Sequence, residues 1–406
     1  MTMLKRVAAV LLAIATLLTF AACRTKDEAA FTFSNGTDKV KIRTALYMCY
    51  LIDATGEFQS EYDTQAAETT EASEETTTAA ATTVDYQKAT VKDDDGNAVD
   101  YVDWVKAKAK EYCAEHAYYE LEFDRLGLEI NDETAEALDY YASYYWDQYS
   151  LATYYEPNGV TYNTYLEYYT NSNYKKYAVY DFYYGEKSED TTETDSDVSE
   201  EIKALEGSLR PADDKITEAL KENFVLVDHV SISFSYTDED SGETVDLTDD
   251  EKADALKTIN GYADRINSGE GFADVYEEYC AQNGIEPSEV SIDESIDAKP
   301  LDKYSTVLNS ADANGGTASE NFDLAVECEV GKAVVKETDS AYHLFYRFDI
   351  TKDPYYSQYC EDSAVEVLCI DEFESNSADK AAELACDTNT GAIGHYSPKK
   401  IIEPEI

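Results

Sequence analysis

Positive charge is scarce in this sequence, which has 32 Lys and Arg residues against 85 Asp and Glu and a net charge of −53. Such a chain repels phosphate-rich surfaces, so we expect neither nucleic acid nor anionic lipid as a partner. No C-x-x-C pair, zinc-type His/Cys spacing, EF-hand loop, Gly-rich phosphate loop or Ser-His-Asp order stands out. We therefore expect no cofactor and no metal.

Cysteine is present eight times, but the spacing does not indicate a disulfide framework. If Cys23 is modified, as argued next, seven thiols remain, and an odd number cannot all pair within one chain. Most of them are expected to be small buried apolar residues. One or two disulfides remain compatible with the sequence.

Only one uncharged apolar run is long enough to suggest targeting, and it lies at the start. Lys5 and Arg6 precede the run from Val7 to Phe20, which is followed by two alanines and Cys23. This order is typical of a secretory signal peptide, and the run is shorter than the ~20 residues of a spanning helix. Residues 20–23 resemble the bacterial lipobox, which implies a signal peptide over 1–22, acylation of Cys23 and a tether over 23–30. Ordinary secretory cleavage is the alternative.

The next segment, 31–210, is predicted to be mainly helical. A helix over Tyr101–Leu126 should stop at Gly127, and another should follow. Residues 62–84 consist almost entirely of Thr, Glu and Ala, so we expect a disordered insertion. The rest of this helical segment is rich in tyrosine. This indicates either a partly solvated groove or a core that uses Tyr in place of Leu and Phe.

Residues 224–350 alternate between strand and helix patterns. In the strand over 225–236, Val230 shares one face with Ile232, whereas His229 shares the other with Ser231. A capping box then opens a helix with one apolar stripe, a second helix follows, and two strands end near residue 350.

Three short stretches in this segment resemble a parvulin-type peptidyl-prolyl isomerase domain. They are Val227-Asp228-His229-Val230-Ser231-Ile232, Ile266-Asn267-Ser268-Gly269-Glu270-Gly271-Phe272-Ala273, and Val330-Gly331 followed by Ala341-Tyr342-His343-Leu344. Together with the flanking helices and the lipobox, the order resembles the PrsA/SurA family of extracytoplasmic foldases. The resemblance spans most of the mature chain apart from the insertion.

This resemblance implies an α+β protein. A mainly helical chaperone domain, formed by the N-terminal part and a C-terminal helix, would carry an inserted parvulin-like domain of about four antiparallel strands and helices. The implied boundaries are a linker helix over 211–223, the inserted domain over 224–350, and a C-terminal segment over 351–406 that packs on the N-terminal domain.

The resemblance also implies the site. His229 and His343 match two facing histidines on adjacent central strands, and Cys280 is the candidate third polar group. Ser231 and Phe345 share faces with the histidines and are expected to bind substrate. A structural role for the two histidines, bonded to each other and holding the sheet, is the alternative.

These observations lead to one functional expectation and two alternatives. The protein would be a membrane-tethered foldase that acts on unfolded or Pro-containing exported polypeptides, isomerising X–Pro bonds. It could instead be an inactive holdase with the same fold, or a surface adhesin or spacer.

Overall fold

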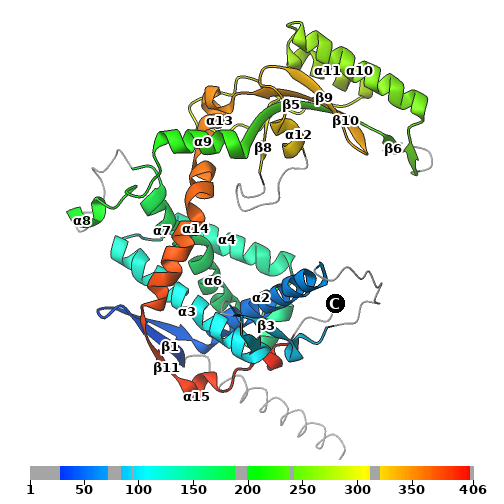
Figure 1. Cartoon of the computed structure of the whole chain (residues 1–406). Coiled ribbons are helices and arrows are strands. Elements are labelled where there is room, and N and C mark those ends of the chain that lie inside the picture. Colours follow the sequence, from blue (N-terminus) through cyan, green and yellow to red (C-terminus); the bar gives the residue numbers. More distant parts are fainter. Residues whose placement is uncertain are drawn as a thin grey trace, which may run out of the picture. The chain divides into compact units, whose positions relative to one another are not determined.

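The computed structural model describes residues 28–71, 84–93, 96–187, 199–237, 242–310 and 321–402. Their architecture is α+β, with helices and several small antiparallel sheets (Figure 1). The chain forms two compact units. Unit 1 comprises the described residues of Met1–Tyr183, Lys187–Glu206 and Glu372–Ile406, and unit 2 those of Tyr184–Glu186 and Gly207–Asp371.

Unit 1 is built mainly from helices. Its elements are β1 (Ala29–Ser34), β2 (Lys39–Arg43), α2 (Thr44–Glu71), β3 (Thr90–Lys92), β4 (Ala98–Asp100), α3 (Tyr101–Leu126), α4 (Asp132–Gln148), α5 (Ala152–Tyr155), α6 (Tyr162–Thr170), a π-helical turn (Asn171–Lys175), α7 (Lys176–Tyr184), α8 (Glu200–Lys203), β11 (Ala385–Thr388) and α15 (Thr390–Ile393). Helix α14 (Glu361–Ala382) begins in unit 2 and ends in unit 1.

Helices α2 and α3 make the central pair of unit 1, and apolar side chains such as Leu46, Leu51 and Phe58 are fully buried there. The expected end of α3 is confirmed, because Gly127 adopts a φ of 70° that a left-handed cap requires. Strands β11, β1 and β2 form an antiparallel sheet in that order, so the end of the chain completes the first sheet.

Two expectations for the helical parts differ from the structure. Helix α2 continues to Glu71, so 62–71 is helical rather than disordered, while 72–83 lies outside the described residues. Residues 351–371 belong to unit 2, and only the later part of the C-terminal segment belongs to unit 1. One local contact contributes: the Tyr356 hydroxyl of helix α13 (Pro354–Tyr359) donates to the Ser305 carbonyl (2.5 Å) of unit 2.

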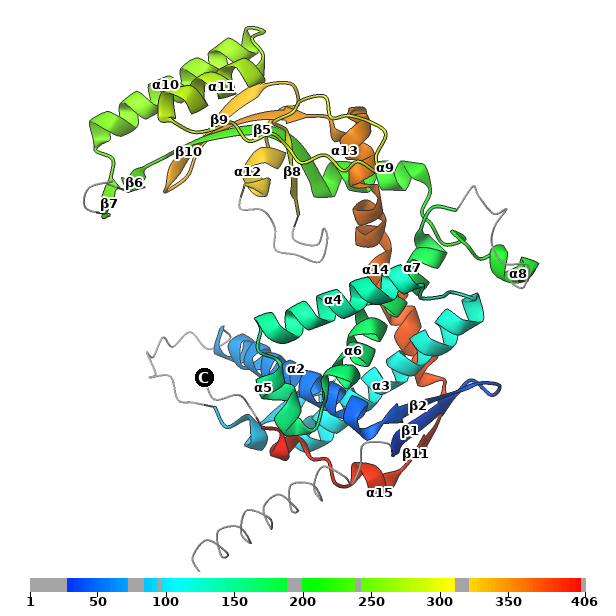
Figure 2. The same cartoon turned by 180° about the vertical axis from the view of Figure 1, so that it is seen from behind.

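Unit 2 contains a four-stranded antiparallel sheet in the order β8-β5-β10-β9. Its elements are α9 (Asp213–Asn223), β5 (Phe224–Ser233), β6 (Ser235–Thr237), β7 (Thr244–Asp246), α10 (Asp249–Asn267), α11 (Phe272–Asn283), β8 (Thr306–Asn309), α12 (Phe322–Val326), β9 (Ala333–Glu337), β10 (Ala341–Phe348) and α13 (Pro354–Tyr359). Both views show α10 and α11 on one side of this sheet and α12 on the other (Figures 1 and 2).

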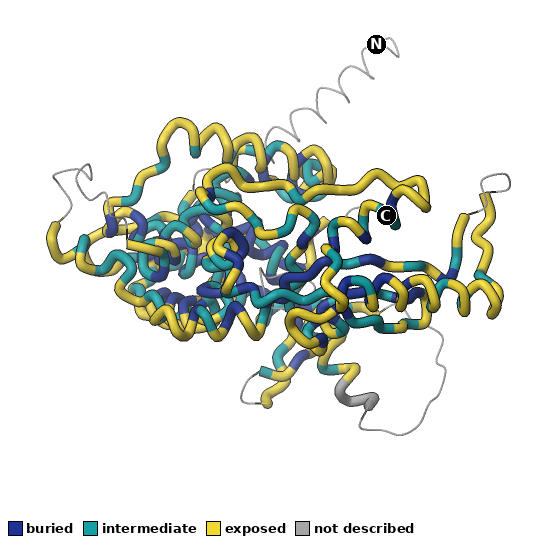
Figure 3. The backbone as a smooth tube through the Cα atoms, turned by 90° about the horizontal axis from the view of Figure 1, so that it is seen from above, coloured by how far each residue is buried: buried dark blue, intermediate teal, exposed yellow. Residues whose placement is uncertain are grey.

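The two faces of the sheet follow the predicted alternation. Val230 and Leu344 pack with α10 and α11, whereas Val227 and Phe345 pack with α12. The predicted capping box at Thr248 is confirmed, with both reciprocal hydrogen bonds to Glu251 present. Buried and exposed residues alternate along the helices (Figure 3), as expected for elements that each cover one side of a core.

Three further facts bear on function. No disulfide forms among the seven cysteines within the described ranges, and all but Cys386 are buried. Over the same ranges, no helix is both long and apolar enough to cross a membrane. No group of His, Cys, Asp and Glu side chains in the described parts is arranged to hold a metal ion.

Candidate functional site

The two predicted histidines lie on neighbouring central strands of unit 2. His229 is on β5 and His343 on β10, and both side chains belong to the face that α12 partly covers. In the antiparallel register His229 faces Phe345, and His343 faces Ser231. The histidines are therefore diagonal neighbours, a relation that still lets ring side chains meet.

The imidazoles are joined by a hydrogen bond. His229 Nε2 lies 3.0 Å from His343 Nδ1, and His343 Nε2 lies 3.4 Å from Thr338 Oγ1. The Thr338 hydroxyl also lies 3.2 Å from the Ala341 carbonyl, and its oxygen accepts from the backbone N–H groups of Ser340 and Ala341. Because a neutral imidazole has one N–H donor and one acceptor nitrogen, one histidine of the pair donates to the other, and the tautomer decides which.

The Phe345 ring packs against the two imidazoles. It stacks on His229 at a centroid distance of 4.6 Å and an angle of 12°, and it lies 5.9 Å from His343. Burial lowers the pKa of His229 to about 4, with a smaller effect from the neighbouring His343, and burial also lowers the pKa of His343. Both rings are therefore neutral at pH 7 and offer one donor and one acceptor each.

The histidine face is closed at one end and open at the other. Near α12, Arg347 donates to the Val326 and Cys328 carbonyls, and an apolar cluster around Phe345 fills the space. Toward the other end of β5, Ser231 and Ser233 are exposed. We define the open polar end, formed by His229, His343, Ser231 and Thr338, as the histidine site.

The structure brings only some of the expected site residues together. Ser231 is exposed beside His343 in the register, as a substrate contact would need. Phe345 is completely buried, so it supports the imidazoles and does not present a surface to a ligand.

Cys280 is not part of the histidine site. It is completely buried on α11, the helix that packs on the opposite face of the sheet. Cys23, the predicted lipid attachment point, lies outside the described residues.

Sequence reasoning missed Thr338, whose hydroxyl lies within hydrogen-bonding distance of His343 Nε2. The residue lies in the turn between β9 and β10, so its side chain returns over the start of β10. The sequence shows a short polar turn before Ala341-Tyr342-His343. It does not show the strand register that brings the Thr338 hydroxyl close to the His343 imidazole.

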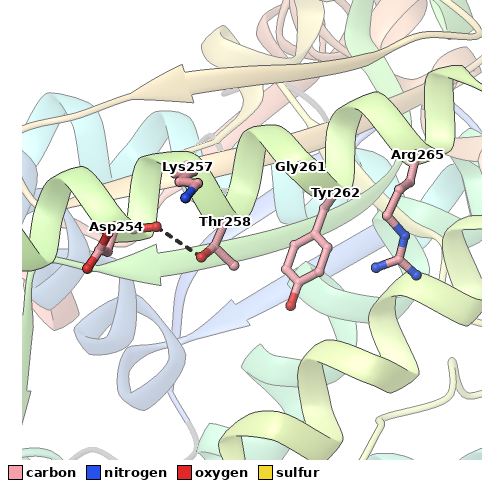
Figure 4. A pocket seen from close by; sticks show the side chains of 6 residues that line it. All are labelled: Asp254, Lys257, Thr258, Gly261, Tyr262 and Arg265. Atoms are coloured by element: carbon pink, nitrogen blue, oxygen red, sulfur yellow. Dashed lines mark hydrogen bonds between the residues drawn. The ribbon is translucent and has the colours of Figure 1, made fainter.

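Three hollows elsewhere in the two units give a comparison. One of about 350 Å³ lies along α10 and is lined by residues from Asp254 to Arg265 (Figure 4), and a second of about 510 Å³ adjoins α13 in unit 2. The third, of about 580 Å³, lies in unit 1. None of the three is lined by His229 or His343. In the first, the cation Arg265 is already paired with Glu270 and Glu278.

The unit 1 hollow borders a second buried polar cluster. His116 of α3 is 3% exposed, and its Nδ1 lies 2.7 Å from the Tyr50 hydroxyl. Burial lowers its pKa to about 4. Lys175 and Asn171 both donate to Glu120. These polar groups are hydrogen-bonded to one another, so we interpret the cluster as a structural one that holds α2, α3 and the π-helical turn together.

Comparison with known proteins adds no relative to this geometry: no protein-family model and no curated protein sequence matches the chain. Function must therefore be argued from the site. Two neutral, mutually bonded imidazoles form a polar framework suited to hydrogen bonding with a substrate. Neither a thiol nor a carboxylate is bonded to either ring among the described residues, so the pair has no partner typical of nucleophilic or proton-transfer catalysis.

Proposed function

We propose that this protein is an extracytoplasmic foldase, held at a membrane by lipid on Cys23, whose unit 2 binds X–Pro segments and catalyses their cis/trans isomerisation in the manner of a parvulin. Unit 1 would hold unfolded exported chains. One observation carries the proposal: the neutral His229–His343 pair, 3.0 Å apart, at the open polar end of a four-stranded antiparallel sheet.

This chemistry suits the site because it needs no strong acid, nucleophile or cofactor. The barrier of ~18–20 kcal/mol arises from amide resonance, which twisting of the bond removes. A site lowers it by binding the twisted amide better than the planar one. The bonded imidazoles would hold donors and acceptors in fixed directions around the amide, while Thr338 acts as a positioning residue for His343.

Isomerase activity is tested by exchange NMR on a panel of X–Pro peptides, which needs no coupling protease. We expect the intact protein to accelerate exchange and both His229→Ala and His343→Ala to lower kcat/KM at least about tenfold. Thr258→Ala, on the exposed side of α10, is the matched control and should keep full activity. Equal and negligible acceleration by all four proteins removes the enzyme claim.

A non-catalytic holdase is the second candidate, and one observation favours it. The third polar group that the resemblance implied, Cys280, lies on the opposite side of the sheet from the histidines. A holdase with this fold would suppress client aggregation, and His229→Ala with His343→Ala would leave that suppression unchanged. Suppression without any acceleration of X–Pro exchange would assign the protein to this class.

The membrane anchor rests on the sequence around Cys23. We expect Cys23→Ser to release the protein from the membrane fraction and to abolish labelling by an alkyne fatty acid. Cys386→Ser, which replaces a thiol of the described chain that is partly exposed, is the control and should change neither. Membrane retention of Cys23→Ser with no lipid label on the unaltered protein contradicts the anchor.

A further inference from the structure

The outward side of α4 carries an unusual density of exposed aromatic rings. Five tyrosines, one of them directly after the helix, are between 37% and 65% exposed; they are Tyr140, Tyr141, Tyr144, Tyr145 and Tyr149. Their i, i+4 spacing places them in two adjacent rows on one side of the helix. On the other side Ala142 and Trp146 are buried. We call these five residues the tyrosine face.

The rings form two groups of contacts, the smaller of which pairs Tyr140 with Tyr141 at 5.4 Å. Tyr145 stacks on Tyr149 at 5.9 Å and 16°, contacts Tyr144 at 5.7 Å, and reaches Tyr169 of α6 at 5.9 Å. The helix beneath is fixed by Trp146, which packs on Tyr155, Tyr162 and Tyr165. Tyrosine rings on a rigid support give a large amphipathic contact area and lose little conformational entropy on binding. Exposed apolar clusters of this kind mark interaction surfaces.

The charged side chains of the helix that carries the tyrosine face have one sign. Helix α4 contains five carboxylates and no Lys or Arg; they are Asp132, Glu133, Glu136, Asp139 and Asp147. Within the described parts of the chain, no Lys or Arg pairs with any of these carboxylates. No described cation lies over a ring of this face either, although Lys303 does so over Tyr304 (4.6 Å) and Lys175 over Phe123 (5.1 Å) in other places. None of these rings and carboxylates pairs with a cation of the described chain, so all of them can attract cations of a binding partner.

We infer that the tyrosine face binds extended, Lys- and Arg-rich polypeptide segments. A guanidinium or ammonium over an exposed ring gains about 0.5–1 kcal/mol, and the flanking carboxylates add attraction over a Debye length of about 8 Å in physiological salt. The net charge of −53 steers cationic segments toward the protein and repels a second copy of it. The inference rests on the proposed function, because it names the class of unfolded chain that unit 1 would hold.

Binding is tested with the full chain by fluorescence anisotropy of three labelled 12-residue peptides. One is rich in Lys and Arg, one replaces these residues with Glu, and one replaces them with Ser. The altered protein carries Tyr140→Ser, Tyr144→Ser and Tyr149→Ser. A matched control carries Tyr236→Ser and Tyr359→Ser, two tyrosines of unit 2 that are 50% and 55% exposed. Circular dichroism verifies that both altered proteins remain folded.

We expect the cationic peptide to bind at least tenfold more tightly than the other two. The triple substitution should weaken that binding at least tenfold, and the control should not. Glu136→Gln with Asp147→Asn should weaken it less and reduce its salt dependence. Equal affinity for all three peptides, an unchanged Kd in the triple variant, or self-association that the triple variant loses would each overturn the inference.

Failure of this inference is separable from failure of the proposed function. Exchange NMR on a short X–Pro tetrapeptide reports the histidine site and should be unaffected by the tyrosine substitutions. Cationic peptide binding without isomerisation would leave the tyrosine face assigned and the enzyme claim refuted. Isomerisation without selective binding of the cationic peptide would support the enzyme claim and refute the assignment of the tyrosine face.

Discussion

Replacing Phe345 with alanine is expected to lower the free energy of unfolding of unit 2 by about 3–5 kcal/mol, the usual range for a buried phenylalanine. The ring has no exposed surface, packs among side chains of β5 and α12, and stacks on His229. Its removal leaves a cavity bounded by two strands and a helix. The strands are hydrogen-bonded into the sheet, so the surroundings cannot fully collapse into the space.

Hydrogen exchange of the β10 amides in the full chain measures this loss, because it reports the opening of unit 2 separately from unit 1. Phe348→Ala is the matched control: Phe348 is on the same strand and half-buried, so about 1 kcal/mol is expected. A loss for Phe345→Ala no larger than that of the control would contradict the packing described here.

The same substitution should also change the histidine site. With the ring removed, water reaches the imidazoles, and the desolvation that lowers the pKa of His229 to about 4 is relieved. NMR titration should move the His229 midpoint upward, toward the ordinary value near 6.5. Phe345→Leu, which keeps an apolar side chain, provides a folded variant in which the shift should be smaller.

The parts of this fold that the sequence predicted well are those with a local cause. Alternation along β5 placed His229 and Ser231 on one face, since successive residues of a strand point to opposite sides. The capping box at Thr248 and the left-handed glycine at Gly127 depend on a few neighbouring residues. Each of these features is determined by residues that are close together in the sequence.

The parts that could not be predicted depend on distant partners. Strand β11 has the sequence Ala-Cys-Asp-Thr, which carries no strand pattern, and it forms because β1 offers a free edge. Helix α2 extends into a Thr/Glu/Ala stretch with few large apolar residues, partly because Gln65 bonds to the backbone of Lys92. Such pairings are set by register and by the packing of whole elements.

The candidate site shows the same division. The meeting of the two histidines was predicted from the resemblance of the β5 stretch and the Tyr-His stretch to a parvulin-type domain, and the structure places the two rings together. Cys280 was misplaced because its position along the chain does not reveal which side of the sheet α11 covers. The support from Phe345 follows from its place opposite His229 in the register, and the contact of Thr338 follows from the turn between β9 and β10. No single-strand pattern fixes either of them.

Asp228, the residue before His229, should make unit 2 less stable as pH rises. Its side chain is completely buried; Oδ1 accepts from Ser305 Oγ (2.7 Å), and Oδ2 has no hydrogen-bond partner in the described part of the chain. Burial raises its pKa to about 7, against about 3.9 in an unfolded chain. Between these values the folded state keeps a proton that the unfolded state has lost, so the free energy of unfolding falls as pH rises from about 4 to 7.

Asp228→Asn removes this dependence, because asparagine keeps the shape and never ionises. At pH 8 the substitution should raise the free energy of unfolding of unit 2 by about 2–4 kcal/mol, since ~3 pH units at 1.36 kcal/mol each set the upper limit. At pH 4 the two proteins should be nearly equal. Urea unfolding at pH 4, 6 and 8 measures the difference, with Asp246→Asn on exposed β7 as the control. A gain in the free energy of unfolding that is the same at all three pH values would contradict this prediction. It would mean that the folded protein stabilises the ionised Asp228 carboxylate as well as water does, so that burial does not raise its pKa.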